Sequence, residues 1–506
     1  MRNPLTPATK PKTRLELSSI ALLTLFIGLY IVLYGQMVIY RHLYFNSTGY
    51  DLGIKDQVIW NISQGRGFAS SVEVANVLGD HFQPIMAVLA LLYLIYPSVY
   101  WLLMFQTMVL ALGAIPIYRL ATRRLQTPLA GLVFAVAYLL HPAIGFINRF
   151  DFHWEAAVVL FFLMAADAID SYKPQQATMW LILALFSKEE MGLTIAAFGL
   201  TATAKKFTRF GLSWLIIGIL TSLLTLFIIM PFIRGGPSDT LERYGWLGAT
   251  PLGMVKTMLL HPIYVLRIMI LERGHDIKLY FNDLFMPVMF LSFLSPLNLL
   301  PALPSMAYNL LSSHYAQRTI MYQYISATMP FVFISAIYGT EAIFRRLDRV
   351  KHGHYFKWGL LITLCINIYL TLNLTPWTDP LNWQRLENES TIYEALALIP
   401  PTAKVYTTNV YVPHVSEREY LYLHDGERLH PQNVGKIDLA AILAKTDIIL
   451  LNAQDKRFIS DAEFHTILLQ AKALGFHVQF FSHGVILLNH DEQIKSLIDI
   501  NELLEQ

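Results

Sequence analysis

Residues 17–40 read LSSIALLTLFIGLYIVLYGQMVIY, and this stretch decides the fold class. It carries no charged side chain and exceeds the roughly 20 apolar residues that a helix needs to cross a bilayer. A cleavable signal peptide has a shorter apolar region, followed by a cleavage site of small residues. We therefore interpret the stretch as a retained first membrane helix. Its basic head, residues 1–16, is expected to stay in the cytoplasm.

The rest of the chain also has the composition of a membrane protein. Of its 506 residues, 55% are hydrophobic and 15% are charged, with a mean hydropathy of +0.44. Soluble proteins carry about 25% charged residues. The net charge of +2 gives no indication of nucleic-acid binding, because Lys and Arg stand at the ends of apolar runs. The single cysteine, Cys365, excludes an internal disulfide.

Clusters of Lys and Arg orient the apolar runs, because such clusters stay in the cytoplasm. After the head, the clusters are Arg119 to Arg124, Lys205 to Arg209 and Arg345 to Lys357. They predict a mainly α, polytopic transmembrane domain at 17–375 with about eleven spanning helices. Its outer loops are 41–98, 148–155 and 234–251. The N-terminus is then cytoplasmic, and the protein is a multi-pass protein of a prokaryotic plasma membrane.

Two parts of this domain are hard to divide into spans. Residues 176–204 predict a pair of short helices. Residues 252–311, together with the preceding Pro251, contain six prolines, and proline inside a helix breaks it. The apolar stretch 85–96 is shorter than the about 20 residues of a span and predicts a re-entrant or interfacial helix. Spanning helices are predicted at 99–118, 129–147, 156–171, 212–233, 322–344 and 358–374.

Residues 376–506 predict a small extracytoplasmic α/β domain. Candidate strands are 404–411, 446–452 and 478–488, the last being a hairpin that turns at Ser482-His483-Gly484. Candidate helices are 388–398, 437–444, 460–474 and 490–505. The domain contains no glycine-rich loop that would hold a phosphate and no cysteines at metal-binding spacing.

Ionisable side chains at membrane depth are costly and usually line a substrate path. Asp51 follows the first helix and is either a general base or metal ligand, or simply the N-cap of a helix over 54–64. His81, in Asp80-His81-Phe82-Gln83-Pro84, either contacts a phosphate or metal or bonds to nearby backbone. Lys188, in Lys188-Glu189-Glu190, either neutralises a substrate phosphate beside an assisting glutamate or forms a buried salt bridge.

The segment Arg149-Phe150-Asp151-Phe152-His153-Trp154-Glu155 is the densest of these groups. In a helix, Asp151 and Glu155 share a face. In an extended segment, Asp151, His153 and Glu155 alternate onto one side. Both arrangements suit a divalent cation or a phosphate with its counter-ion. Weaker substrate-binding candidates are His314 and Arg318, and the loop 234–246 is a candidate cover.

Five motifs carry a resemblance to known families: YDLGIKDQVIWNISQGRGF (50–68), HFQPIMAVL (81–89), FDFHWEA (150–156), SKEEMGL (187–193) and VPHVSER (412–418). They resemble a prokaryotic family of predicted membrane proteins that is defined by a domain of unknown function. The layout over residues 15–350 resembles the GT-C class of membrane glycosyltransferases. The shared features are an acidic residue after the first helix, a short His/Pro-led helix and a second acidic outer loop.

The resemblance implies an enzyme that takes a sugar from a polyprenyl-phosphate carrier and passes it to an acceptor at the outer face. It implies Asp51 as the catalytic acid–base residue, with Glu155 and Glu189 assisting. Asp151, His153 and Glu155 then match the second acidic loop, which would bind Mg²⁺ or Mn²⁺. Carrier and substrate contacts fall on the polar residues of these motifs and loops: His81, Gln83, Arg149, Lys188, His314 and Arg318. The chain departs from the class in lacking an Asp-x-Asp pair in the first loop and a tryptophan-rich motif in the tail.

Two other functions are compatible with the sequence. Proline-broken helices favour a transporter or lipid flippase. Against it, the sequence shows no repeated halves, and the ionisable residues gather at one face and not at the midplane. A non-catalytic membrane subunit that anchors the tail is the third alternative, although a passive anchor gains nothing from clustered carboxylates.

Overall fold

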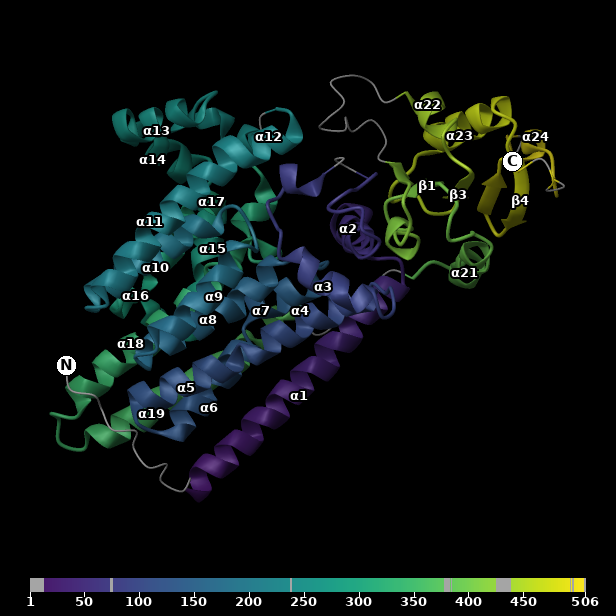
Figure 1. Cartoon of the computed structure of the whole chain (residues 1–506). Coiled ribbons are helices and arrows are strands. Elements are labelled where there is room, and N and C mark those ends of the chain that lie inside the picture. Colours follow the sequence, from purple (N-terminus) through teal and green to yellow (C-terminus); the bar gives the residue numbers. More distant parts are fainter. Residues whose placement is uncertain are drawn as a thin grey trace.

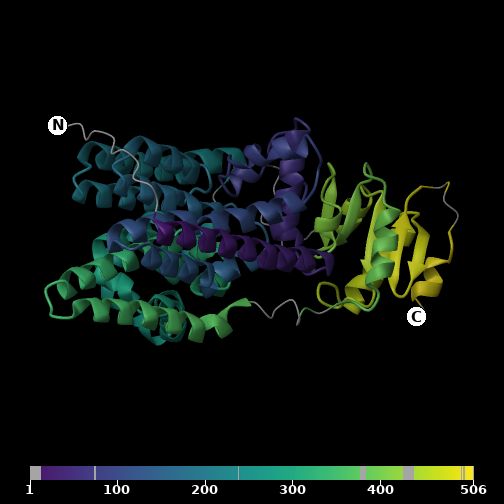
Figure 2. The same ribbon diagram turned by 90° about the horizontal axis from the view of Figure 1, so that it is seen from below.

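The computed structural model shows a bundle of membrane helices with an α/β domain at one end (Figure 1). It describes residues 13–72, 76–236, 239–376, 383, 385–424, 438–491, 493 and 496–504. The predicted basic head therefore lies largely outside the described residues. Seen at right angles, the long first helix runs beside the bundle and ends against the α/β domain (Figure 2).

The bundle begins with one long helix and continues with many shorter ones. The long helix, α1, spans Arg14–Leu43 and starts with a capping box in which Thr13 and Glu16 satisfy each other's backbone amides. The others are α2 (Ile54–Ser63), α3 (Met86–Tyr93), α4 (Tyr100–Leu112), α5 (Ala114–Leu125), α6 (Pro128–Leu139), α7 (Pro142–Arg149), α8 (Glu155–Asp170), α9 (Pro174–Leu185), α10 (Met191–Ala204), α11 (Thr208–Leu224), α12 (Met230–Arg234), α13 (Pro251–Leu260), α14 (Pro262–Leu271), α15 (Gly274–Phe285), α16 (Pro296–Leu299), α17 (Leu303–Leu311), α18 (Met329–Leu347) and α19 (Gly353–Thr371).

Few of these helices satisfy the length and hydropathy of a membrane span by themselves. Within the described residues, four do so: 14–43, 100–125, 208–234 and 353–374. Two bent pairs raise the number to six, α6 with α7 at 45° and residues 241–260 with α14 at 90°. The count of about eleven spans stays a prediction, as does the sidedness. Below, the outer face means the end of the bundle that carries the α/β domain.

Proline decides where several predicted helices break. The helix predicted at 129–147 is divided at His141, because Pro142 cannot donate a backbone hydrogen bond to the preceding turn. The helix predicted at 322–344 begins only at Met329, followed by Pro330 in its first turn. Pro262 similarly stands at the start of α14, directly after the 90° bend.

Helices α10 and α11 approach each other so closely that their backbones touch. A Cβ atom at Gly199 would lie 2.5 Å from the carbonyl oxygen of Gly211, and one at Gly192 would lie 2.5 Å from that of Gly218. Small residues at helix interfaces are the usual means of close packing in membranes, where van der Waals contact drives association. These glycines therefore join α10 and α11 into one unit.

The C-terminal domain is a five-stranded mixed sheet in the order β2-β1-β3-β5-β4. Its strands are β1 (Val405–Thr408), β2 (Leu421–His424), β3 (Ile448–Asn452), β4 (His477–Ser482) and β5 (Val485–Asn489). β1 pairs in parallel with β2 and β3, whereas β5 is antiparallel to β3 and β4. The sequence analysis predicted β1, β3 and the β4–β5 hairpin and missed β2, which has only four residues.

The helices of this domain follow the prediction except at its end. They are α21 (Glu389–Ala397), α22 (Leu439–Leu443), α23 (Asp461–Ala473) and α24 (Ile500–Leu504). Of the helix predicted at 490–505, the described residues show only α24 near its end, and the start of the helix predicted at 437–444 lies outside the described residues. α23 begins with a capping box made by Ser460 and Glu463.

Candidate active site

Segments far apart in the sequence meet around a cavity of about 390 Å³ at the outer face. Small-molecule sites typically measure about 300–1,000 Å³. The walls come from the first outer loop, the α7–α8 connection, the α9–α10 bend, the loop before α13 and the segment before α18. The lining residues are Tyr50, Asp51, Lys55, Asp80, His81, Gln83, His153, Glu155, Lys188, Glu242, Arg243, Tyr308, Gln323 and Tyr324.

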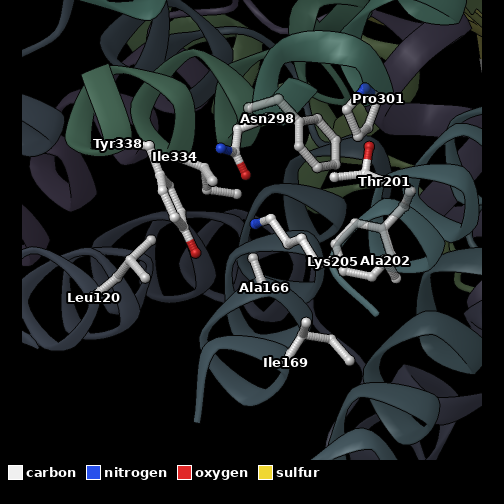
Figure 3. Close-up of a pocket in the computed structure, with 12 residues that line it drawn as sticks. Leu120, Ala166, Ile169, Thr201, Ala202, Lys205, Asn298, Pro301, Ile334 and Tyr338 are labelled. Carbon is white, nitrogen blue, oxygen red and sulfur yellow. The ribbon is translucent and has the colours of Figure 1, made fainter. Parts of the chain in front are cut away.

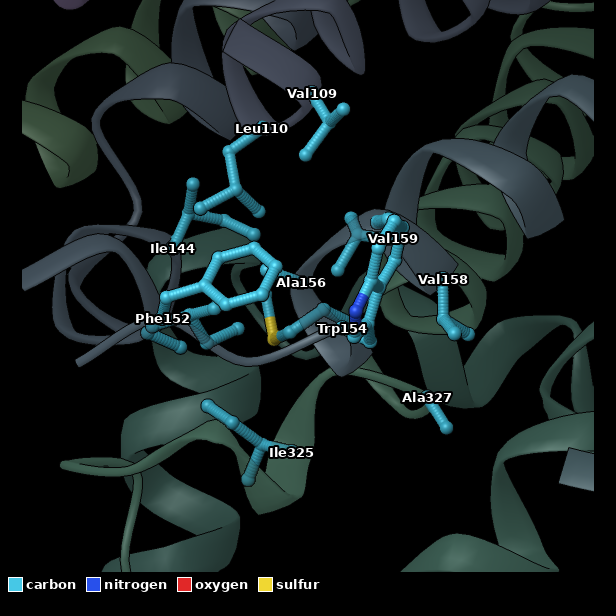
Figure 4. Close-up of a cluster of buried hydrophobic side chains, with 14 of the residues drawn as sticks. Val109, Leu110, Ile144, Phe152, Trp154, Ala156, Val158, Val159, Ile325 and Ala327 are labelled. Carbon is cyan, nitrogen blue, oxygen red and sulfur yellow. The ribbon is translucent and has the colours of Figure 1, made fainter. Parts of the chain in front are cut away.

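The α7–α8 connection alternates between the apolar core and the polar side. Phe152 and Trp154 are 0% and 1% exposed, and both point into a cluster with Val109, Leu110 and Ile144 (Figure 4). The residues that alternate with them, Asp151, His153 and Glu155, are thereby turned the other way. Of the two arrangements considered from the sequence, the extended one is therefore present, and α8 starts only at Glu155.

Asp51 and His153 form a pair at the cavity wall. The His153 Nε2 atom lies 3.1 Å from Asp51 Oδ1, and 29% of the Asp51 side chain is exposed. His153 Nδ1 lies 2.8 Å from the Asp151 carbonyl, which fixes this nitrogen as the donor. Nε2 can then donate to the carboxylate only in the doubly protonated form of His153, which pairs with an ionised Asp51.

The surroundings of Asp51 favour its ionised form. Burial raises the pKa of the Asp51 carboxyl, but hydrogen bonds from His153 and Thr48 and the charge of His153 outweigh burial. The pKa of Asp51 therefore lies below its ordinary value. Asp51 stands inside a short π-helical turn, Gly49–Gly53, that precedes α2. It is not the N-cap that the alternative interpretation expected, because Gly53 occupies that position and makes no side-chain cap.

Asp151 supports this pair from behind and does not line the cavity. It is completely buried and forms an ion pair with Arg41, in the last turn of α1. Its other oxygen accepts hydrogen bonds from the Thr48 backbone N–H, at 2.9 Å, and hydroxyl, at 2.8 Å. The same hydroxyl oxygen lies 3.1 Å from Asp51 Oδ2, so its single hydrogen is shared between the two carboxylates. A buried carboxylate needs such partners to offset its loss of hydration.

Lys188, at the α9–α10 bend, is held by two carboxylates. Its Nζ donates to Glu155 Oε1 at 2.5 Å and lies 3.7 Å from Glu190 Oε2. Gln83 donates to the second oxygen of Glu155 at 3.3 Å. Burial raises the pKa of Glu155, but the charges of Lys188 and His153 outweigh it and hold this pKa well below its usual range. Both alternatives for Lys188 are thus compatible with its place: it is salt-bridged, and it lines the cavity.

Glu189 holds His81 in place. One Glu189 oxygen lies 3.0 Å from His81 Nδ1, and the other accepts the Phe82 backbone N–H at 3.0 Å. Burial lowers the pKa of His81, but the charges of Asp80 and Glu189 outweigh it and raise this pKa above its ordinary value. The two carboxylates thus favour the protonated form of His81. Asp80 lies 3.2 Å from Arg234.

The sequence analysis missed two further cations of the cavity as site residues. Lys55 stands one helical turn after Asp51, and Arg243 belongs to the loop that was named only as a candidate cover. The i, i+4 spacing of Asp51 and Lys55 was the available signal, since such residues share a helix face. Tyr50, Tyr308 and Tyr324 complete the wall with aromatic rings.

Three predicted substrate-binding residues are not among the lining residues. Arg149 lies with its guanidinium 5.6 Å from the centre of the Phe146 ring. Arg318 pairs with Asp276 at 2.9 Å and donates to the Ser312 carbonyl at 2.7 Å. His314 contacts the cavity only indirectly, through an edge contact with the ring of Tyr324.

The predicted metal ligands do not form a ligand set. Asp151 faces Arg41, His153 faces Asp51, and Glu155 faces Lys188. Nowhere in the described ranges do three or more His, Cys, Asp or Glu side chains gather in a way that suits a metal ion. The residues present therefore do not fit Mg²⁺ or Mn²⁺ at this position, and we derive no chemical step through a metal.

A second cavity lies deeper in the bundle, beside Lys205, Asn298 and Tyr338 (Figure 3). Its volume is only about 20 Å³. That is close to the space of one water molecule. The cavity beside Asp51 is therefore the better candidate for a substrate site.

Comparisons with known structures place the fold. ArnT from Cupriavidus metallidurans, bound to undecaprenyl phosphate, is similar with a TM-score of 0.52 and 10% identity, over 94% of this chain and 99% of that one. In its apo state, ArnT gives a TM-score of 0.50 and 12% identity over 95% and 99%. An oligosaccharyltransferase of Archaeoglobus fulgidus, in complex with Zn and sulfate, gives a TM-score of only 0.46 and 11% identity, over 93% of this chain and 74% of that one.

Sequence comparison adds the family. None of the curated proteins matches this sequence. Residues 41–487 match the family described as "Predicted membrane protein (DUF2079)". The chain therefore belongs to this family of membrane proteins, and its likeness to ArnT shows that its fold resembles that of the GT-C glycosyltransferases.

Proposed function

We propose that the protein is a glycosyltransferase of the GT-C type, which transfers a sugar from a polyprenyl-phosphate carrier to an acceptor at the outer membrane face. One observation carries this proposal: a partly exposed, ionised carboxylate, Asp51, shares a single cavity with Lys55, Lys188 and Arg243. Sugar transfer from a phosphate carrier can use a carboxylate as the base and cations that stabilise the departing phosphate. The similar ArnT structure, bound to undecaprenyl phosphate, supports a carrier of this chemistry.

Asp51 acts as the general base in this proposal. It accepts the proton of the acceptor hydroxyl as that oxygen attacks the sugar carbon. His153 orients Asp51 and holds it ionised before the reaction, because its Nε2 atom contacts the carboxylate at 3.1 Å. Asp151 and Arg41 keep the backbone around His153 and Thr48 in place.

The cations stabilise the departing carrier phosphate. Negative charge accumulates on the phosphate when the bond to the sugar breaks, and fixed cations in a low-dielectric site stabilise it more than water does. Lys188 is 3% exposed at its side chain and Lys55 is 5% exposed as a residue, so both are largely shielded from solvent. Glu155 then holds Lys188, and Glu189 holds His81, so that neither glutamate needs to react.

Binding and transfer in a purified system test the proposal. The full-length protein in nanodiscs is titrated with undecaprenyl phosphate, and Lys188→Met with Glu155→Leu serves as the binding-deficient variant. We expect saturable binding that this double variant weakens at least about tenfold, since a charge-assisted contact contributes about 1.5–3 kcal/mol. Candidate undecaprenyl-phosphate sugars are then supplied, and released undecaprenyl phosphate is measured.

The two alternative functions, a flippase and a non-catalytic subunit, predict different results. Binding is measured in the same nanodiscs, and movement of lipid between leaflets is measured in vesicles. A flippase would move a fluorescent polyprenyl phosphate between leaflets without cleaving the sugar. A non-catalytic subunit would neither bind the carrier nor release it. Absence of saturable carrier binding by the unmodified protein contradicts the proposal. Comparing binding with and without EDTA, Mg²⁺ or Mn²⁺ tests the predicted divalent cation, for which the described side chains offer no ligand set.

A further inference from the structure

The first outer loop is fastened to the C-terminal domain directly beside Asp51. Asn409, which follows strand β1, accepts hydrogen bonds from this loop through two oxygens. The Gly49 N–H lies 2.8 Å from its backbone carbonyl and 2.8 Å from its side-chain oxygen, and the Tyr50 N–H lies 3.4 Å from the latter. Asn409 is only 8% exposed. Its side chain therefore fixes the two residues that precede Asp51.

Packing against Val412 fixes the loop on both sides of Asp51. A Cβ atom at Gly53 would lie 2.6 Å from Val412 Cγ1, and one at Gly49 would lie 2.8 Å from Val412 Cβ. Gly53 has ordinary helical dihedrals, φ −63° and ψ −44°, so an alanine there would be limited by space and not by backbone strain. Val412 is completely buried. The loop and this turn of the C-terminal domain are thus complementary in shape.

A third contact continues the same interface into α2. Ser416 donates to Asp56 at 2.6 Å, and the Gln57 amide donates to the Arg418 carbonyl at 3.1 Å. Contacts thus run along the chain from Gly49 to Gln57, a stretch that contains both Asp51 and Lys55. A domain that only shared a linker with the bundle would have no need of such contacts.

We propose that the C-terminal domain positions the catalytic loop, with Asn409 and Val412 as positioning residues that act through Asp51. The role of Asp51 rests on the proposed function, whereas the mechanical coupling does not. Neither residue touches the cavity, since neither is among its lining residues. A displacement of Asp51 by about 1 Å suffices to lower a rate by about 100-fold, because catalysis depends on near-attack geometry.

A rescue experiment on the full-length protein in nanodiscs tests the coupling. Gly53→Ala should drive the loop away from Val412, because its Cβ would overlap Val412 Cγ1. Val412→Ala removes Cγ1. The atoms then nearest to the new Cβ of residue 53 are Pro413 N at 3.5 Å and Val412 Cβ at 3.6 Å, which are ordinary contact distances. We expect Gly53→Ala to raise amide exchange in 48–54 about tenfold, and Gly53→Ala with Val412→Ala to restore most of the protection.

Asn409 gives a second, independent comparison. Asn409→Ala should raise exchange at Tyr50 about threefold to tenfold, the range of one lost hydrogen bond, whereas Gly49 keeps its bond to the backbone carbonyl of residue 409. Asn409→Asp keeps the acceptor oxygen and should keep the protection. Asn388→Ala is the matched control, because Asn388 is 4% exposed and its side-chain amide donates inside the domain, to Asn452 and the His483 carbonyl.

Two readouts separate this inference from the proposed function. Once a donor is known, Gly53→Ala should lower kcat more than it weakens the binding of undecaprenyl phosphate, to which Lys188 on another segment also contributes, and the double variant should recover kcat. If the unmodified protein binds no undecaprenyl phosphate, the proposed function fails, yet the exchange data still decide the coupling. Equal exchange of 48–54 in all variants, or no rescue by Val412→Ala, overturns the inference.

Discussion

The two ends of the bundle both gather charged residues, but they arrange them differently. At the end opposite the C-terminal domain, arginines of α5 face carboxylates of α8 and α18. Arg123 lies 2.6 Å from Asp167 and 2.9 Å from Asp170, and Arg124 also pairs with Asp170. The adjoining crevice measures about 710 Å³ and is larger than the Asp51 cavity.

The difference lies in what each carboxylate faces. Asp170 is 3% exposed at its side chain and accepts bonds from Arg123, Arg124 and the Tyr338 hydroxyl. Asp51 keeps 29% of its side chain exposed toward the outer cavity. Neither clustering of charge nor cavity size therefore distinguishes a reactive site. What distinguishes it is an ionised group that its partners orient but do not cover.

Removing the Asp51 charge should produce the largest effect. Asp51→Asn keeps the shape of the side chain and removes the base, so we expect the transfer rate to fall about 10²–10⁴-fold, the usual contribution of general base catalysis. Undecaprenyl phosphate should still bind within about twofold. Release of undecaprenyl phosphate from its sugar conjugate measures the rate. A variant with more than a tenth of the original rate would remove Asp51 from the mechanism.

Breaking the Lys188–Glu155 pair should affect both stability and binding. Lys188→Met leaves Glu155 buried without its cation, which typically costs about 3–5 kcal/mol. Adding Glu155→Leu should return most of the unfolding free energy but none of the carrier affinity. Thermal unfolding and undecaprenyl phosphate titration measure the two separately. Restored affinity in the double variant would mean that Lys188 is only structural.

The same kind of change at the opposite end should affect stability alone. Asp170→Asn removes a charge shared by two arginines that are about one-third exposed. Solvent screens such pairs, so the expected cost is about 1–2 kcal/mol in unfolding free energy. The transfer rate per folded molecule should not change. If that rate falls with Asp170→Asn as it does with Asp51→Asn, the contrast between the two ends is wrong.

The smallest expected effect is a pH dependence at the domain interface. Burial and the charge of Asp56 raise the pKa of Glu417 to about 8, and burial raises the pKa of Asp56 to about 6. The folded state thus binds protons more tightly than the unfolded chain, in which a Glu pKa is about 4.3. Protonation of these two carboxyls therefore stabilises the folded state fully below about pH 4.3, and this stabilisation is lost as the pH rises through about 8.

Amide exchange of residues 410–418 between pH 6 and pH 9 measures this effect, after correction for the intrinsic pH dependence. Protection should decrease severalfold toward pH 9 in the unmodified protein. Glu417→Gln should flatten the profile, because it removes one of the two titrating carboxyls. A decrease of equal size in Glu417→Gln would assign the pH dependence to other groups.

Much of the bundle and part of the site follow from local patterns in the sequence. Hydropathy located the core of most helices, and the polar motifs at Asp51, His81, His153, Glu155 and Lys188 indeed meet at one cavity. Such residues stand out because charge is rare beside apolar runs. The breaks at Pro142 and Pro262 were less clear, since proline permits either a kink or an end.

The partners of these side chains could not be predicted from the sequence. Asp151 and Glu155 looked like metal ligands because their nearest cations, Arg41 and Lys188, are distant in sequence. The contact of Asn409 with Gly49 joins residues 360 positions apart. Local periodicity contains no information on such pairs, because they form only when the whole bundle and the C-terminal domain have assembled.

The glycine contacts between α10 and α11 have a mechanical consequence for the site. Residues Ile216, Leu220 and Leu223 of α11 are apolar and about half exposed, as expected of a helix that contacts lipid, whereas α10 follows directly after the Lys188 bend. Because the two helices touch through their backbones, a change in the tilt of α11 must carry α10 with it. Helices respond to bilayer thickness by tilting. The acyl-chain length of the surrounding lipids would thus set the position of Lys188 and, in the proposed mechanism, its contact with the carrier phosphate.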